Sequence, residues 1–415
     1  MPTATPTRYR WELLAWLWLA FFLNQADRQL FNVLLPAIRR SVPLTDAEAG
    51  LIASLFVVTV GVCIPVAGVA GDLFSRKRII ALSVLVWSAA TLLTGASATL
   101  AQLILFRSLA VGGGEAFYAP PANALIGEEH GATRSLAMAV HQTALYAGII
   151  LSGWLGGYVA ERYDWRVAFY GFGGAGILLA GLLAWRLRST PVASIQPDRS
   201  EQRAFLRAGF RSLFGSPTGR LLTVAFCAMV FVNVGFLTWI PTYLHETFRL
   251  SLTDAGFTSM AYHHLAAFGG VLLGGWLSDR LARRGRAGRL WVQAVGMLGA
   301  VPFLLGLGQA TTLPGLILCL IGFGLGRGFY DANIYATVYD VVPPAYRSTA
   351  SGLLAMTGFL SGAVAPLLLG YLKPTLGLSL GLSALGAVYL LGGLSVVAVA
   401  LFHPKQKPQP AWTSA

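Results

Sequence analysis

Charged and amide side chains occur inside long apolar stretches of this chain, where an ionisable group costs free energy unless it meets a partner or water. The most polar patch is residues 24–29, which contains Asp27 and Arg28 between Phe and Leu residues. Arg107 and Glu115 occur eight residues apart in a second apolar stretch. A carboxylate that gives up its guanidinium partner to an arriving anion takes up a proton more readily. These residue types therefore suit proton-linked binding of an anion.

The spacing of Arg107 and Glu115 predicts that each has a partner on another helix. Eight residues correspond to about 12 Å along a helix axis, too far for a direct ion pair. The stretch with Asp27 and Arg28 is the natural source of partners. We predict Asp27 and Glu115 as the proton-coupling carboxylates, with Arg28 as their exchangeable partner. The alternative is an internal ion-pair network that fixes helix packing and neither titrates nor touches substrate.

A third polar group is formed by Arg327 and Asp331, four residues apart on one helix face, where they can neutralise each other. Arginines within apolar stretches indicate an anionic substrate, because a guanidinium binds carboxylate or phosphate at two points. The adjacent His263 and His264 point about 100° apart on a helix, so at most one is expected to face a cavity. The predicted substrate-binding residues are Arg28, Arg107, His141, Gln142, Tyr146, Asn233, Trp239, His263, Arg327, Tyr330 and Asn333.

Membrane-spanning helices must position these residues. Hydrophobic residues make up 55% of the 415 positions and charged residues 11%, whereas a soluble protein carries about a quarter charged residues. A spanning helix needs roughly 20 apolar residues, and the continuous apolar runs lack the period of two that marks barrel strands. The twelve transmembrane helices predicted for this all-α membrane protein are residues 13–36, 48–71, 79–98, 101–125, 135–160, 167–186, 221–244, 256–277, 290–309, 314–338, 349–371 and 378–402.

The formal net charge of +13 reports orientation. With twelve crossings both termini share one side, and most of the 30 Lys and Arg fall there, which makes it the cytoplasmic side. We therefore expect an inner (plasma) membrane protein with cytoplasmic termini, no nucleic-acid partner and no cleaved signal peptide. The polar residues 187–220 form a cytoplasmic linker between two six-helix bundles, residues 1–186 and 221–415. The linker is either solvated or contains a short helix on the membrane surface.

One pattern occurs twice, after the second and the eighth predicted helix. Gly68 precedes Asp72 by four residues and Gly275 precedes Asp279 by four, and each acid is followed by a cluster of basic residues. This resembles the cytoplasmic loop motif of the major facilitator superfamily. The resemblance implies contacts that hold the cytoplasmic side closed in the outward-facing state. The gating residues it implies are Asp72, Arg76, Arg78, Asp279, Arg280 and Arg284.

Within that family, residues 24–28 and 107–120 resemble the anion:cation symporter branch, which includes sugar-acid permeases and sialin-type transporters. Asp27, Arg28, Arg107 and Glu115 match by type the residues that form the proton and anion machinery of that branch. The interval from Arg107 to Glu115 is one residue longer than in those relatives, which turns the arginine by about 100° on a regular helix. Spinster-type transporters carry a similar Asp-Arg and Gly-Glu-Ala arrangement, so the motif does not separate the two.

The resemblance implies two pseudo-symmetric bundles around a midplane cavity in a monomeric secondary active transporter. Its expected function is proton-coupled symport of a small organic anion, a carboxylate or sugar acid, by alternating access. The alternatives are a spinster-like lipid or lysophospholipid transporter, a sugar-phosphate exchanger, and a membrane enzyme or receptor that transports nothing. The sequence has no phosphate-binding Gly-x-x-x-x-Gly-Lys-Ser/Thr loop and no Cys/His metal cluster. We therefore expect no enzyme activity and no catalytic residues, metal or cofactor, with the proton gradient as energy source.

Overall fold

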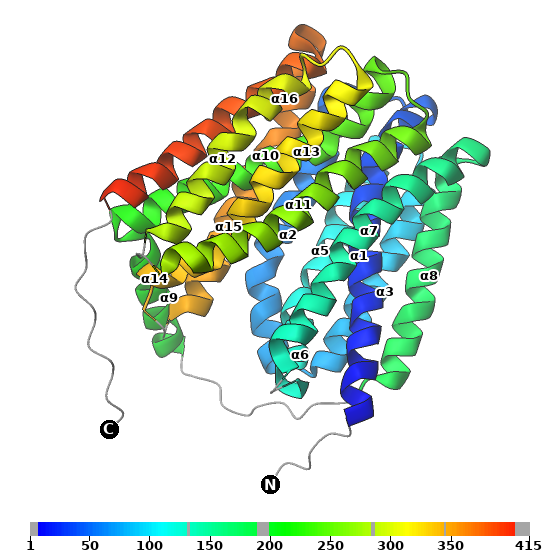
Figure 1. The fold of residues 1–415 in the computed structure, drawn as a ribbon. Helices are drawn as coiled ribbons and strands as arrows, with labels where there is room; N and C mark the ends of the chain where they lie inside the picture. Colours follow the sequence, from blue (N-terminus) through cyan, green and yellow to red (C-terminus); the bar gives the residue numbers. More distant parts are fainter. Residues whose placement is uncertain (1–6, 131–132, 189–198, 284–286, 344–345, 403–415) are drawn as a thin grey trace, which may run out of the picture.

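The computed structural model describes residues 7–130, 133–188, 199–283, 287–343 and 346–402, and every regular element in these ranges is a helix (Figure 1). Eight helical segments are long and apolar enough to cross a membrane. The prediction of an all-helical membrane architecture is confirmed to that extent. Some helices, such as Thr7–Ser41 and Leu252–Ala282, are longer than the spans predicted for them, because polar residues at their ends continue the helix beyond the apolar core. The helices Arg76–Gly95 and Gly288–Leu307 have the predicted length.

The first half of the chain packs its helices in pairs, α1 against α7, α3 against α8, and α2 against η1 and α5. The region predicted as one helix over residues 101–125 is divided into four segments, with a break at residues 117–118. The elements of this half are α1 (Thr7–Ser41), α2 (Asp46–Leu73), α3 (Arg76–Gly95), α4 (Leu100–Leu103), η1 (Ile104–Ala110), α5 (Val111–Ala116), α6 (Ala119–Glu129), α7 (Arg134–Arg162) and α8 (Trp165–Arg186).

The second half repeats this style of packing, with α10 against α16, α11 against α13, and α12 against both α13 and α16. The predicted helix over residues 314–338 is also broken, at residues 332–333. The elements are α9 (Arg199–Phe214), α10 (Pro217–Thr247), α11 (Leu252–Ala282), α12 (Gly288–Leu307), α13 (Leu313–Asp331), α14 (Ile334–Val341), α15 (Arg347–Gly362) and α16 (Val364–Phe402). The linker contains a helix, α9, and the position of this helix on the membrane surface stays a prediction.

Local sequence explains where several elements begin and turn. Thr45 caps α2 in a reciprocal pair, since its side chain accepts from the Glu48 N–H and the Glu48 carboxylate accepts from the Thr45 N–H. Within α16, Gly377 has φ +72°, a left-handed conformation that interrupts the helical path. The helix α16 is therefore kinked at Gly377, between the two spans predicted at residues 349–371 and 378–402.

The two halves meet most closely at one end, where glycines let backbones touch. A Cβ on Gly153 of α7 would lie 2.5 Å from the carbonyl oxygen of Gly256 on α11. On the other side of this end, a Cβ on Gly50 of α2 would lie 2.4 Å from the Pro366 carbonyl oxygen of α16. In Figure 1 the helices of the two halves converge at this end and spread apart toward the ends of α6, α9 and α14.

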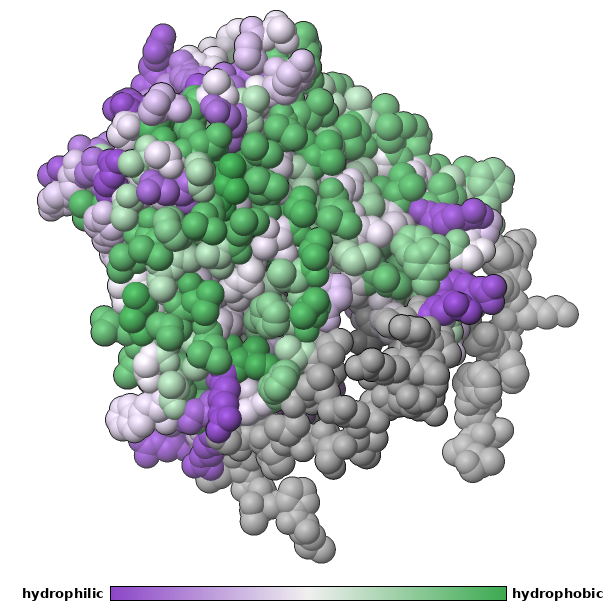
Figure 2. Space-filling model, turned by 180° about the vertical axis from the view of Figure 1, so that it is seen from behind, coloured by the Kyte–Doolittle hydropathy of each residue, from purple (hydrophilic) through white to green (hydrophobic). Residues whose placement is uncertain are grey.

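The outer surface is apolar over a broad band, with hydrophilic residues gathered toward the ends of the helices (Figure 2). Leu178, Trp185, Leu272 and Leu391 on this surface each expose more than half of their area. Exposure of such a surface to water costs free energy, whereas contact with the hydrocarbon tails of lipids does not. The fold therefore places polar groups in its interior between the halves and apolar groups on its exterior.

Candidate functional site

A cavity of about 530 Å³ lies between the two halves, a size typical of small-molecule sites. Its walls come from α1, α2, η1 and α7 of the first half and from α10, α11, α13, α14 and α15 of the second. The polar and charged side chains that line it are Gln25, Arg28, Gln29, Asn32, Arg107, Gln142, Tyr146, Asn233, Thr238, His264, Arg327, Asp331 and Tyr335.

Arg28 joins the cavity to a buried carboxylate. Its Nε donates to Glu115 Oε2 at 3.0 Å and its Nη2 lies 2.9 Å from the same oxygen. The Glu115 side chain is fully buried, and its other oxygen has no hydrogen-bond partner among the described residues. The partnership expected between the first helix and Glu115 is present, and its cation faces the cavity while its anion lies behind.

Asp27 lies on another face of α1, outside the cavity lining. Its Oδ2 accepts from the Thr91 hydroxyl of α3 at 3.4 Å, and its buried Oδ1 has no partner in the described part of the chain. It interacts electrostatically with Glu115 and Arg107. Asp27 therefore belongs to the same buried charge cluster as Glu115, although it is not bonded to Arg28.

Arg107 reaches the cavity because the helix around it is a π-helix. In η1 (Ile104–Ala110) the Val111 N–H bonds the Phe106 carbonyl, one residue further back than in an α-helix. The π-turn accommodates one more residue between Arg107 and Glu115, without the rotation of about 100° that this residue would cause in a regular α-helix. The Arg107 guanidinium donates to the Arg28 carbonyl at 2.8 Å and lies 4.1 Å from the centre of the Phe56 ring. Its Nε and Nη1 are buried without a partner among the described residues.

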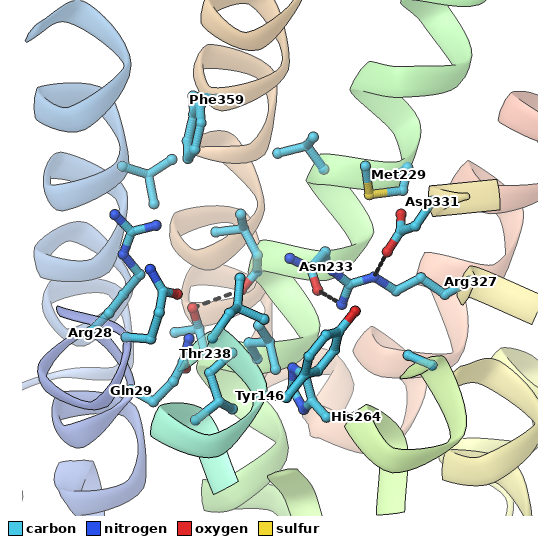
Figure 3. A pocket seen from close by; sticks show the side chains of 18 of the residues that line it. Arg28, Gln29, Tyr146, Met229, Asn233, Thr238, His264, Arg327, Asp331 and Phe359 are labelled. Atoms are coloured by element: carbon cyan, nitrogen blue, oxygen red, sulfur yellow. Dashed lines mark hydrogen bonds and ion pairs between the residues drawn. The ribbon is translucent and has the colours of Figure 1, made fainter. Parts of the chain in front are cut away.

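The opposite wall is built around Arg327 of α13. Its Nε donates to Asp331 Oδ2 at 3.2 Å, the four-residue pairing that the sequence suggested. Its Nη1 bonds the side-chain oxygen of Asn233 on α10 and lies 3.2 Å from His263 Nε2 on α11. Both Arg327 and Asp331 line the cavity, in the last turns of α13 before the break at residues 332–333. Figure 3 shows Arg28 and Arg327 on opposite sides of the cavity.

Gln142, Tyr146 and Asn233 of the predicted binding residues also line the cavity. His141 does not, since it is buried against Phe21 and lies 3.2 Å from the Tyr118 hydroxyl. His141, Phe21 and Tyr118 all belong to the first half of the chain, so His141 contacts its own half and not the cavity.

Trp239, Tyr330 and Asn333 lie away from the cavity wall as well. The Trp239 indole donates to the Pro366 carbonyl at 3.0 Å, and the Asn333 amide donates to the Ser278 hydroxyl at 2.7 Å. Tyr330 is buried. A polar residue inside an apolar helix needs a hydrogen-bond partner, and a backbone carbonyl or a side-chain hydroxyl of a neighbouring helix supplies one as well as a substrate would.

One of the two adjacent histidines faces the cavity, and it is His264, whereas His263 lies behind it against Arg327. The predicted set also omitted Gln25, Gln29 and Asn32, which line the cavity from α1. Together with Arg28 their spacing of three to four residues marks one face of a helix, a signal available in the sequence. Thr238 and Tyr335 gave no comparable signal.

The predicted gating residues that the structure describes lie at the helix ends remote from the close contacts between the two halves (Figure 1). Arg76 pairs with Glu128 within the first half. Arg78 and Asp279 are exposed, and Arg280 lies 5.5 Å from the centre of the Trp276 ring. The side chain of Asp72, and Arg284, lie outside the described residues. Within the part that is described, no group of three or more His, Cys, Asp or Glu residues suits a metal ion.

A family model described as the Major Facilitator Superfamily matches residues 17–366. The chain therefore belongs to this superfamily and is an integral membrane transporter and not an enzyme. A probable galactarate/D-glucarate transporter of Bacillus subtilis is 27% identical over 96% of this chain and 92% of its own length. A D-galactonate transporter of Escherichia coli is 27% identical over 95% and 96%, respectively. Spinster homolog 1 of Xenopus laevis is 29% identical over 85% of this chain and 70% of its own length.

A solved structure supports the fold. It is the crystal structure of a bacterial homologue of the human lysosomal transporter spinster in an inward-facing, unoccupied conformation. The two chains superpose with a TM-score of 0.76 at 24% identity, over 96% of this chain and 95% of that one. The likeness concerns the arrangement of the helices.

Proposed function

We propose that this transporter carries a small organic anion, a carboxylate or sugar acid, together with protons, with no cofactor besides the proton gradient. One observation carries the proposal: Arg28 faces the cavity while bonded to the fully buried Glu115. Such an arginine can bind an external carboxylate only by giving up or sharing its internal one. The affinity for the anion is then linked to the charge on Glu115.

The sequence of events follows from this exchange. In the empty cavity Glu115 is ionised and Arg28 neutralises it. A substrate carboxylate that binds Arg28 leaves Glu115 buried with less compensation, which favours its protonation. Asp27 lies in the same charge cluster and is the second proton acceptor. Release of the anion on the other side returns Arg28 to Glu115 and expels the proton.

The identity of the substrate class is supported by the relatives whose names specify sugar acids, the galactarate/D-glucarate and D-galactonate transporters. The cavity offers what such molecules require. Arginines meet the carboxylate, and Gln29, Gln142 and Asn233 supply donors and acceptors for hydroxyl groups.

The topology belongs to the same proposal. Besides the eight apolar segments, α1, α11 and the divided stretch of residues 100–129 are each long enough to cross the bilayer but contain polar residues. The segment Thr349–Phe402 has 54 residues, about 80 Å of helix, and the Gly377 turn divides it into two crossings. This makes twelve crossings of a monomer in two pseudo-symmetric bundles, residues 1–186 and 221–415. The linker of residues 187–220 and both termini then lie in the cytoplasm, beneath the plasma (inner) membrane.

Spinster-type lipid or lysophospholipid transport is the second candidate, because spinster homolog 1 is the most identical of the three relatives described above. A lipid headgroup with a phosphate would meet Arg28 as a carboxylate does. The two functions predict different inhibitors of the same cavity, a hydrophilic sugar acid or a long-chain amphiphile.

Uptake into proteoliposomes tests the proposal. We expect wild-type protein to accumulate labelled gluconate or glucarate when the outside is made acidic, and Arg28→Ala to abolish both binding and uptake. Glu12→Gln is a matched control for carboxylate variants, because Glu12 is partly exposed and pairs with Arg186 away from the cavity. The proposal fails if uptake of the labelled acid is the same with and without a pH gradient. It also fails if the protein binds lysophospholipid and no sugar acid.

A further inference from the structure

The cavity has a second cationic side that symport of a monocarboxylate does not use. Arg28 and Arg107 come from the first half of the chain, whereas Arg327 comes from the second, on the opposite side of the cavity (Figure 3). Asn233 and Tyr146 are drawn between the two sides. A ligand that spans the cavity therefore meets a guanidinium at each end.

Each side carries its own internal counter-ion. Glu115 bonds Arg28, and Asp331 bonds Arg327 through one oxygen, while the other Asp331 oxygen is buried without a partner among the described residues. The two pairs lie on different bundles and do not bond each other in the described structure. Each side can therefore exchange its carboxylate for a ligand carboxylate independently.

The surroundings of Arg327 hold it in place for this exchange. Asn233 on α10 and His263 on α11 both contact its Nη1, so two neighbouring helices fix the guanidinium. The side chain remains 17% exposed, on a cavity wall. A guanidinium that is held by Asn233 and His263 as well as by Asp331, and that faces a cavity, is preorganised for an anion, because little rotamer entropy remains to be lost.

We propose that Arg327 and Asn233 form a second anion subsite and that the preferred substrate is an organic dicarboxylate, held by Arg28 at one end and Arg327 at the other. The proposal rests on the proposed function and narrows its substrate class. A monocarboxylate fills only one subsite. A dicarboxylate contacts Arg28 in the first half and Arg327 in the second at the same time. Its binding therefore favours the conformation in which the two halves close around it.

Binding of a matched pair of ligands tests the subsite. Glucarate and gluconate have the same carbon chain and differ in one terminal carboxylate. A charge-assisted hydrogen-bonded contact corresponds to about a ten- to hundredfold change in Kd. We expect the wild-type protein to bind glucarate about ten- to hundredfold more tightly, by calorimetry on purified protein. In Arg327→Gln, glucarate affinity should fall to the gluconate level, and gluconate affinity should change less than threefold.

A second variant separates a ligand subsite from a structural ion pair. Asp331→Asn removes the internal competitor of the substrate and leaves Arg327, so glucarate affinity should stay the same or rise. If Arg327 and Asp331 served packing alone, both variants would weaken both ligands alike, and this outcome overturns the subsite. Arg162→Gln, an exposed arginine outside the cavity, controls for the general loss of positive charge.

A failure of a variant to fold, a failure of the second subsite and a failure of the proposed anion transport give different results. If Arg327→Gln does not yield monodisperse protein because Asp331 is left unpaired, the charge-neutral double variant Arg327→Gln/Asp331→Asn replaces it, with the same expected loss of glucarate preference. If wild-type protein accumulates gluconate with protons but shows no preference for glucarate, the second subsite is wrong and the proposed function stands. If wild-type protein binds neither acid, the proposed function fails, and the subsite fails with it.

Discussion

Lys373 of α16 lies 2.9 Å from Asp46 of α2, an ion pair that joins the two halves at the end of the molecule where they converge. Arg39 of α1 bonds the same Asp46 oxygen at 2.5 Å, and Lys373 also contacts Glu246 of α10 at 2.9 Å. The cluster therefore connects helices of both halves on the side opposite the start of α1 and the end of α16 (Figure 1). By the proposed topology this is the outer side, so the conformation is closed outward.

The first prediction concerns this outer cluster. Asp46→Asn weakens contacts to both Arg39 and Lys373, whereas Glu246→Gln removes only one of the two partners of Lys373. Partly exposed ion pairs contribute about 0.2–1 kcal/mol each, which corresponds to a change of up to about fivefold in a population ratio. We expect Asp46→Asn to raise the outward-open population more than Glu246→Gln does.

Double electron–electron resonance between spin labels on the outer ends of the two bundles measures these populations. Equal effects of the two variants, or no shift in either, would show that the cluster follows the closure of the outer side and does not stabilise it. The substitutions are conservative in shape, so a loss of folding is not expected to obscure the comparison.

The second prediction concerns the π-helix. Deletion of one residue from a regular α-helix turns everything beyond it by about 100°, but a deletion within η1 can convert the wide turn into an α-turn. Leu109 is 45% exposed, so its side chain contributes little packing. We expect the Leu109 deletion to fold and to retain at least a tenth of wild-type uptake, because Arg107 and Glu115 keep their faces.

Deletion of Val140, partly exposed in the regular helix α7, is the matched control and should abolish folding or uptake. Thermal melting and proteoliposome uptake of the two variants decide the matter. If the Leu109 deletion is as damaging as the control, η1 does not act as a register adjustment.

This helix also marks the boundary of what the sequence could predict. Apolar length predicted the helices, and residue type predicted the charge groups around Arg28 and Arg327. The face that Arg107 presents could not be predicted, because a regular α-helix has 3.6 residues per turn and a π-turn changes that number locally. The hydrogen-bond partners of Trp239 and Asn333 could not be predicted either, because they are the Pro366 carbonyl and the Ser278 hydroxyl on other helices.

The third prediction separates the adjacent histidines. His264 faces the cavity, whereas His263 contacts Arg327 from behind. We expect His264→Gln to raise the Km for uptake severalfold with little change in melting temperature. His263→Ala removes a contact of the partly buried Arg327 guanidinium and should lower stability by about 1–3 kcal/mol. Comparison of uptake kinetics with thermal melting checks both expectations, and a reversed pattern would contradict the assignment of the two roles.

The last prediction concerns proton coupling through Glu115 and Asp27. Glu115→Gln removes the internal competitor for Arg28, so substrate binding and exchange should persist while accumulation driven by a pH gradient is lost. Asp27→Asn should also lose proton-driven accumulation, but with less effect on binding, because Asp27 does not bond Arg28 in the described structure. Counterflow exchange and acid-driven uptake in the same proteoliposomes separate the two activities, and Glu12→Gln should preserve both. If both carboxamide variants still accumulate substrate against its gradient with wild-type pH dependence, the two carboxylates serve only as structural members of the ion-pair network.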